Sequence, residues 1–222
     1  MNYLWQEFNI KTFPAETIVF KDGVFMPELS TLESCIIDKK YDLPVHIIYA
    51  GEIAGENNIN IEINIPGQKV FLTAKIQNNL PAFLNIFVKN TGKKSFFRGQ
   101  VLAQNYSELN ISAHGHHLAP ETGIILSTKV VAHSGSVSKL TGAAEIEKNC
   151  TDCDSDIGFS ALAAPNARIE FTPKQLIRST PAAAGHSASL YRGSRHQIEY
   201  LRESGLSGAE VKAVLEEAFL FC

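Results

Sequence analysis

The chain lacks several features that would place it in a common functional class. Its 20 Lys and Arg residues are outnumbered by 23 Asp and Glu residues, so the formal net charge is −3. Nucleic-acid binding proteins need a basic excess to neutralise phosphates, so we expect no nucleic-acid partner. No run approaches the ~20 apolar residues of a membrane helix, and the N-terminus lacks the basic and apolar regions of a signal peptide. These absences predict a cytoplasmic protein that binds neither membrane nor nucleic acid.

Two catalytic motifs and a disulfide framework are also missing. The sequence contains neither a Gly-x-Ser-x-Gly nucleophile elbow nor a Walker-type phosphate loop, which excludes these routes to hydrolysis and ATP binding. Its four cysteines, Cys35, Cys150, Cys153 and Cys222, are too few for a disulfide scaffold at this length. In a reducing compartment they remain thiols, which are available to metal or sulfur.

What the sequence contains is mainly short strands. Between Pro44 and Phe171 we find apolar or alternating segments separated by turn signals, and no convincing amphipathic helix. The pattern fits a sandwich, a barrel or a coil of short parallel strands, and it does not choose between them. The expected strands are His46–Tyr49, Ile59–Ile63, Val70–Ile76, Phe83–Val88, Ser95–Ala103, Glu108–Ser112, Gly123–Ala132, Ala143–Ile146, Asp156–Phe159 and Arg168–Phe171.

The two ends of the chain differ from this central region. Residues 17–26 predict a hairpin around Asp22-Gly23, because Asp-Gly is a favoured pair for a tight primed turn. After Pro181 we expect a small-residue loop over Ala182–Ser189. These boundaries divide the chain into an N-terminal cap (1–40), a β-core (41–180) and a C-terminal loop with helices (181–222).

Two short helices are predicted within the C-terminal segment. The first covers Gly193–Ser204 and ends at Gly205, a suitable C-cap residue. The second begins after Ser207, which with Glu210 has the spacing of a capping box. Its apolar stripe must pack on the core or on a partner, because such short helices are unstable alone. This stripe consists of Val211, Val214, Leu215, Ala218 and Phe219.

A first candidate site is a histidine cluster. On a strand, His114 and His116 face the same side, and Glu121 follows with the His-x-His-x4-Glu spacing of a cupin metal motif. Two imidazoles and a carboxylate bind Fe, Mn or Zn. No second cupin motif follows. The cluster therefore gives an alternative hypothesis, a cupin-like metal-dependent enzyme.

A second candidate is the Cys150-x-x-Cys153 pair. Two thiolates on one side of a turn can make two metal bonds. A closed four-cysteine zinc site needs a second pair, which the chain lacks. A redox dithiol normally lies at a helix start in a βαβ unit, and no such unit is visible.

The C-terminal third resembles a known family. Arg168-Ile-Glu-Phe171, the lone His186 and Tyr200-Leu201-Arg202 followed by Gly205-Leu206 are similar to the C-terminal signature of the SufB/SufD proteins, scaffolds of iron–sulfur cluster assembly. Cys153-Asp-Ser155, followed by Ile157-Gly158, resembles a late-strand phrase of SufB. The chain is identified as a short, minimal member. It is closer to SufD, because the acidic neighbours of the SufB histidine are absent.

The resemblance implies a fold and a function. It implies a right-handed parallel β-helix and a non-catalytic scaffold that dimerises through that helix with itself or with a SufB/SufD paralogue. A transient iron–sulfur cluster or iron would be handled by His186, Cys153 and Cys150. The stretch that matches the SufB cysteine, Phe159–Pro165, contains no cysteine, so either Cys150 or Cys153 replaces it or the chain is not of the sulfur-accepting type. A SufC-type ABC ATPase, which supplies the ATP chemistry, would bind the C-terminal helices. The implied partner surface consists of Tyr200, Leu201, Leu206, Val211, Leu215 and Phe219.

Overall fold

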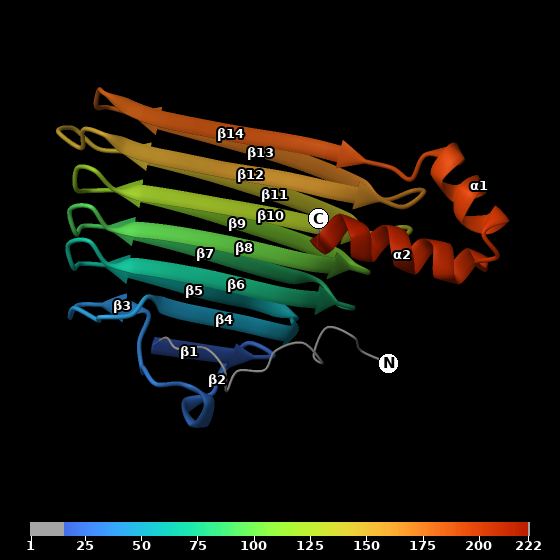
Figure 1. The fold of residues 1–222 in the computed structure, drawn as a ribbon, viewed down its shortest axis with the longest axis horizontal. Coiled ribbons are helices and arrows are strands. Elements are labelled where there is room, and N and C mark those ends of the chain that lie inside the picture. Colours follow the sequence, from blue (N-terminus) through green and yellow to red (C-terminus); the bar gives the residue numbers. More distant parts are fainter. Residues whose placement is uncertain (1–15, 222) are drawn as a thin grey trace.

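A computed structural model describes residues 16–221 and consists of two parallel sheets with two helices at the C-terminal end (Figure 1). The first fifteen residues of the expected cap, and Cys222, lie outside the described residues. In spatial order, the eight-stranded sheet contains β14 (Ala182–Tyr191), β12 (Cys153–Ala163), β10 (Gly123–Ala132), β8 (Phe96–Asn105), β6 (Lys69–Asn78), β4 (Val45–Glu52), β1 (Glu16–Lys21) and β2 (Val24–Phe25). The six-stranded sheet contains β13 (Arg168–Ile177), β11 (Val137–Ile146), β9 (Glu108–His117), β7 (Ala82–Asn90), β5 (Gly55–Ile63) and β3 (Ile36–Ile37). The remaining elements are the 3₁₀ turn η3 (Pro27–Leu29) and the helices α1 (Arg195–Glu203) and α2 (Gly208–Phe221).

The connectivity is that of a parallel β-helix of about seven turns. From β4 onward the chain alternates between the two sheets, so each strand pairs in parallel with the strand two places further along. Lys69 pairs with Phe96, and Phe96 with Gly123, so each turn of this part takes 27 residues. This arrangement confirms the β-helix that the resemblance implied. It also resolves the choice between sandwich, barrel and coil that the strand pattern left open.

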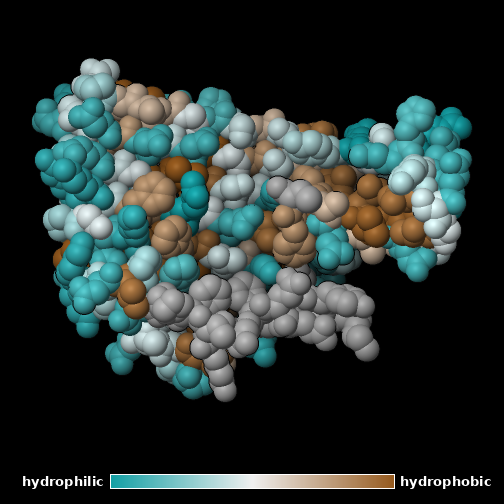
Figure 2. Space-filling view, viewed as in Figure 1, coloured by the Kyte–Doolittle hydropathy of each residue, from teal (hydrophilic) through white to brown (hydrophobic). Residues whose placement is uncertain are grey.

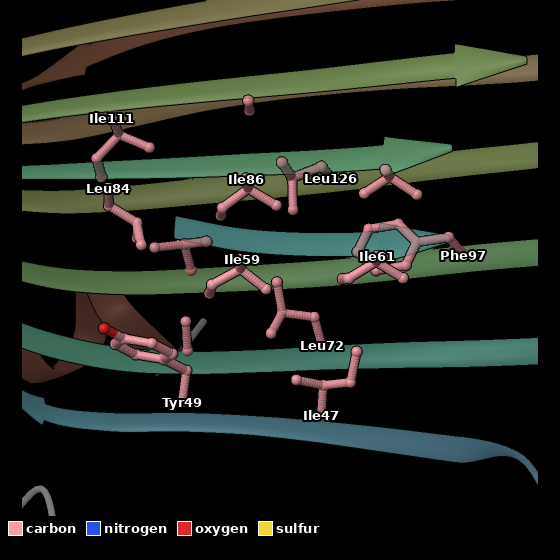
Figure 3. Packing of buried hydrophobic residues seen from close by; sticks show 14 of the residues in the cluster. Ile47, Tyr49, Ile59, Ile61, Leu72, Leu84, Ile86, Phe97, Ile111 and Leu126 are labelled. Atoms are coloured by element: carbon pink, nitrogen blue, oxygen red, sulfur yellow. The ribbon is translucent and has the colours of Figure 1, made fainter. Parts of the chain in front are cut away.

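The core lies between the two sheets. Along β6 every second side chain is buried, because successive residues of a strand point to opposite faces. The inward positions are mostly Ile, Leu, Val and Ala, and their removal from water is the main stabilising term. Figure 3 shows Ile59 of β5, Leu72 of β6, and Leu84 and Ile86 of β7 meeting in this interior. The result is one continuous apolar core.

The expected elements are found, with one exception. The Asp22-Gly23 hairpin is present, with Phe20 paired to Phe25 in antiparallel fashion. All ten predicted strands exist, although most are longer, and β9 extends through His117. The loop expected over Ala182–Ser189 is wrong, because these residues form β14 and pair with β12. The small side chains of this segment show no alternation of apolar and polar residues, so the sequence did not predict a strand. The backbone hydrogen bonds between β12 and β14 form regardless of side-chain size.

Both C-terminal helices begin with capping boxes. Ser194 and Gln197 cap α1 reciprocally. Ser207 and Glu210 do the same for α2, as predicted. Among the described residues, no helix is long and apolar enough to span a membrane.

Helix α2 lies across the outer face of the eight-stranded sheet near β10 (Figure 1). Leu220 packs there with Leu102 and Val131. In addition, Lys129 Nζ donates a hydrogen bond of 3.0 Å to the Phe219 carbonyl. Figure 2 shows apolar side chains gathered over α2 and polar ones over α1. α2 is therefore the helix that fixes the C-terminal segment to the β-helix.

Candidate functional site

The C-terminal end of the β-helix is uncovered. Within residues 16–221, strands β13 and β14 are the last in their sheets, so one edge of each lacks a neighbouring strand. We call the inward-facing positions of these two strands the open end. Each is the register partner of a buried position on the preceding turn, but none of them is itself fully buried. They are Ile169, Phe171, Pro173, Gln175 and Ile177 on β13, and Ala182, Ala184, His186, Ala188 and Leu190 on β14.

His186 is the single titratable side chain of the open end. Its register partner is Ile157, which is only 3% exposed, whereas His186 is exposed because no further strand covers it. The flanking Ala184 and Ala188 carry only methyl groups on the same face. The imidazole therefore stands in a shallow apolar surface that another chain could approach closely.

The two cysteines lie one turn below the open end. Cys150 is 3% exposed and Cys153 1% exposed, and with Ile146 they form a small buried cluster against which Ala182 and Ala184 pack. Cys153 Sγ lies 3.3 Å from Thr122 Oγ1. The structure thus brings both thiols close to the strand that carries His186, but it buries them.

Burial governs the chemistry of this cysteine region. It raises the pKa of the Cys150 thiol, with a smaller contribution from Cys153. Burial also lowers the pKa of His117 to about 4, helped by the charge of His116. His117 Nδ1 lies 2.7 Å from Thr122 Oγ1, and its Nε2 has no partner within the described part of the chain. Because a thiolate is the reactive form of cysteine, this raised pKa disfavours reaction at Cys150 while the packing persists.

The cupin-like ligand set does not form. His114 and His116 do share the outer face of β9, with parallel rings 6.1 Å apart. Glu121, however, lies in the turn after β9, where its carboxylate oxygens are 2.9 Å from Lys93 Nζ and 3.3 Å from Lys94 Nζ. These lysines lower the pKa of Glu121 and hold its side chain. The hypothesis of a cupin-like enzyme therefore has no support in the structure.

The carboxylates that do meet these histidines come from the next strand. Glu145 on β11 is the register partner of His116, and Glu147 follows just after β11. His116 Nε2 lies 3.4 Å from Glu147 Oε1 and 3.9 Å from Glu145 Oε2. The sequence reading missed both glutamates. They come about thirty residues after the histidines, and only the length of the intervening turn of the β-helix brings them together.

The proposed partner-binding residues differ widely in their exposure to solvent. Tyr200 is 70% exposed, while Val211 is only 4% exposed and packs inward. Leu201, Leu206, Leu215 and Phe219 are half-buried. A groove of about 520 Å³ runs between the two helices and the ends of β10 and β12. The helical segment therefore presents part of its apolar surface and uses the rest for docking.

These features define a parallel β-helix protein with an uncovered last turn and an appended helical segment. The family model described as "SUF system FeS cluster assembly, SufBD core domain" matches residues 77–219, which include the later turns, α1 and most of α2. The chain belongs to this family. The family resemblance noted in the sequence is thereby confirmed.

Curated relatives agree with this assignment. Iron-sulfur cluster assembly SufBD family proteins of Mycobacterium bovis and Mycobacterium tuberculosis are each 29% identical to the chain over 105 residues. The corresponding protein of Mycobacterium leprae is 28% identical over the same length. Each alignment spans 47% of this chain and 12% of the relative. The chain is thus similar to a small part of much longer proteins.

Proposed function

We propose that the protein is a non-catalytic scaffold for SUF-type iron–sulfur cluster assembly, acting in the cytoplasm, where its thiols stay reduced. The observation that carries the proposal is the open end, a surface of small and apolar residues around one histidine. Imidazole is a competent ligand for iron, and the surrounding methyl groups leave room for a second protein surface. Membership of an assembly family supports the same conclusion.

The open end is the proposed dimer interface. Edge strands carry unpaired N–H and C=O groups that readily pair with another chain. Leu190 is 50% exposed there and Ile177 is 43% exposed, which adds apolar area to be buried. A two-fold contact between two such ends would bring the His186 side chains of both chains to one interface. A SufB/SufD paralogue with a similar end could take the place of the second copy.

Cys150 and Cys153 are proposed as secondary handlers of iron or sulfur. Both thiols are buried beneath β14, so they become accessible only when that strand or the turn before β12 moves. Assembly of a second chain on the open end is an event that could produce such movement. His186, which is already exposed, is proposed as the first contact for iron.

The ATPase is proposed to be a separate protein of SufC type, since this chain has no phosphate-binding loop. Its docking surface would be the helical segment, where Tyr200 is 70% exposed and Phe221 51% exposed. Leu206 and Leu201 lie at the end of α1 and add partly exposed apolar area. Val211, Leu215 and Phe219 would contribute mainly by holding α2 in position.

The dimer is tested with a charge placed on the open end. Ala188→Lys puts an ammonium group on the inward face of β14, whereas Ala183→Lys puts it on the outward face of the same strand. Light scattering should report a monomer for Ala188→Lys and a dimer for the wild type and the Ala183→Lys control. A wild-type mass of one chain at all concentrations, also with a SufB/SufD paralogue added, contradicts the interface.

Iron handling and ATPase binding are tested together by anaerobic co-purification. The scaffold hypothesis predicts a stable complex with a SufC-type ATPase that is lost in Tyr200→Asp and kept in the control Leu80→Asp, which alters an exposed leucine of the β-helix. After reconstitution with iron and sulfide, visible absorbance should decrease in His186→Ala. No complex, and no absorbance that depends on His186, would overturn the function proposed here.

A further inference from the structure

We propose that the outer face of the six-stranded sheet binds a divalent transition-metal ion, of the Zn²⁺ or Fe²⁺ kind, through His116, Glu145 and Glu147, with His114 as an additional ligand. The site is separate from the open end, because these side chains point out of the β-helix from β9 and β11. The inference does not depend on the proposed scaffold function.

The ligand atoms converge on a small volume. One ligand atom each from His116, Glu145 and Glu147 can be chosen so that all lie within 4.8 Å of one another, and this is the only such group among the described residues. Glu145 Oε2 is 3.7 Å from His114 Nε2 and 3.9 Å from His116 Nε2. Metal bonds of ~2.1 Å place neighbouring ligands about 3–4 Å apart, so the spacing suits a bound ion.

Among the described residues, the contacts of Glu145 leave one of its oxygens free for an ion. At 3.7 and 3.9 Å, Glu145 Oε2 is beyond hydrogen-bond distance from both imidazoles. Its other oxygen, Oε1, is taken by Arg178 Nη1 at 3.0 Å. Glu145 Oε2 therefore faces two imidazole nitrogens without a hydrogen bond to either. A cation bound by Glu145 Oε2, His114 Nε2 and His116 Nε2 would form three coordination bonds at a place where these atoms form no hydrogen bond with one another.

Chemistry selects the class of metal. Two imidazoles and one or two carboxylates are the donor set of zinc and non-haem iron(II) sites, whereas magnesium and calcium prefer oxygen ligands alone. Side-chain exposures of 20% for His116, 21% for Glu145 and 29% for Glu147 leave the site partly shielded yet open to an incoming ion. We therefore expect a site that exchanges its metal with solution.

Arg178 is the competitor for this site. Its Nη1 lies 2.6 Å from Glu147 Oε1 and 3.0 Å from Glu145 Oε1, which partly neutralises both carboxylates. The Arg178 side chain is 39% exposed and follows directly after β13, so it can swing away. If the cluster were only an ion-pair network, Arg178 would be its centre and no metal would bind. A metal site instead predicts that removing this guanidinium strengthens metal binding.

The test is titration of the chelator-stripped full chain with Zn²⁺ by calorimetry, repeated with Fe²⁺ under anaerobic conditions. The wild type should bind one ion per chain, and both His116→Ala and the near-isosteric Glu145→Gln should weaken binding at least ~10-fold. Arg178→Ala should tighten it several-fold. His196→Ala and Glu121→Gln are matched controls for a histidine and a glutamate outside the site, and they should bind as the wild type does.

Three outcomes overturn the proposal. They are absence of binding by the wild type, binding that survives both His116→Ala and Glu145→Gln, and binding lost only in His186→Ala. Circular dichroism of each variant checks the fold, and Glu145→Gln keeps the side-chain shape if His116→Ala perturbs β9. Loss of the scaffold activity in a His186 variant, with Zn²⁺ binding unchanged, would separate this site from the open end.

Discussion

The last covered turn and the open end occupy equivalent positions in the β-helix but differ in composition. Ile157 and Phe159 on β12 are 3% and 1% exposed, and their register partners on β14 are His186 and Ala188. The alternation of inward and outward positions continues through β14, but a histidine and an alanine stand there opposite Ile157 and Phe159. A strand that terminates a fold in water would be expected to carry charges or proline, as β13 does at Pro173 and Lys174, whereas β14 contains neither proline nor an Asp, Glu, Lys or Arg residue. The comparison suggests that the open end is built to receive another protein surface.

The largest loss of stability is expected from a substitution in the last covered turn. Phe159→Ala removes a ring that is 1% exposed and stacks near Phe171, so it should lower the free energy of unfolding by about 4 kcal/mol. Urea denaturation measures the change. A loss below about 1 kcal/mol would mean that the turn beneath the open end is loosely packed, and the contrast between the two turns would disappear.

A second prediction concerns pH and the buried His117. Burial lowers the pKa of His117 to about 4, so the unfolded state binds more protons between about pH 6.5 and 4. Stability therefore falls as the pH falls through this window, by roughly 3 kcal/mol from this residue. Unfolding measured at several pH values should show a flatter dependence in His117→Gln than in the wild type. Equal slopes would contradict a neutral, buried His117.

A substitution that weakens the attachment of α2 to the sheet should have a smaller effect than the two changes described above. Leu220 is 2% exposed against Leu102 and Val131, whereas Val214 on the same helix is 40% exposed. Leu220→Ala should weaken docking of the helix by about 2 kcal/mol, and Val214→Ala should have almost no effect. Hydrogen exchange of the α2 amides measures this local opening. Equal protection in both variants would show that the helix is held by other contacts.

The smallest effect is expected at the open end of the isolated chain. Leu190 is 50% exposed, so Leu190→Ala in dilute solution should change stability by less than about 0.5 kcal/mol. The cost should grow with protein concentration, because a second copy would bury this side chain in the proposed dimer. A cost of several kcal/mol at every concentration would show that Leu190 is already covered within one chain.

The sequence predicted the strands well because their signal is local. Alternating apolar residues and Asp-Gly or Pro-Gly turns can be recognised within ten residues, and Gly123–Ala132 was predicted with the bounds of β10. The β-helix itself came from resemblance, since parallel pairing at intervals of 25 to 31 residues leaves no local pattern. β14 was missed because alanines and serines on an edge strand carry no apolar periodicity.

The candidate sites show the same division between local and long-range information. His186 was found from its motif, and its exposure at the open end then followed from the fold. His114 and His116 were placed correctly on one face, but Glu121 was the wrong carboxylate. Spacing within a motif suggested Glu121, whereas Glu145 reaches His116 through the register of β9 and β11. Contacts of this kind depend on the length of a turn of the β-helix, which the strand pattern does not reveal.

The most direct test of the proposed interface is hydrogen exchange along β14 at low and high protein concentration. On an edge strand, alternate amides bond to β12 and the others point to the open side. We predict that those amides of residues 183–190 that point to the open side exchange quickly in dilute protein and become protected as the concentration rises. In Ala188→Lys their exchange should not change with concentration. Fast exchange of these amides at every concentration, also with a SufB/SufD paralogue and the ATPase present, would contradict the assignment of the open end as the assembly interface.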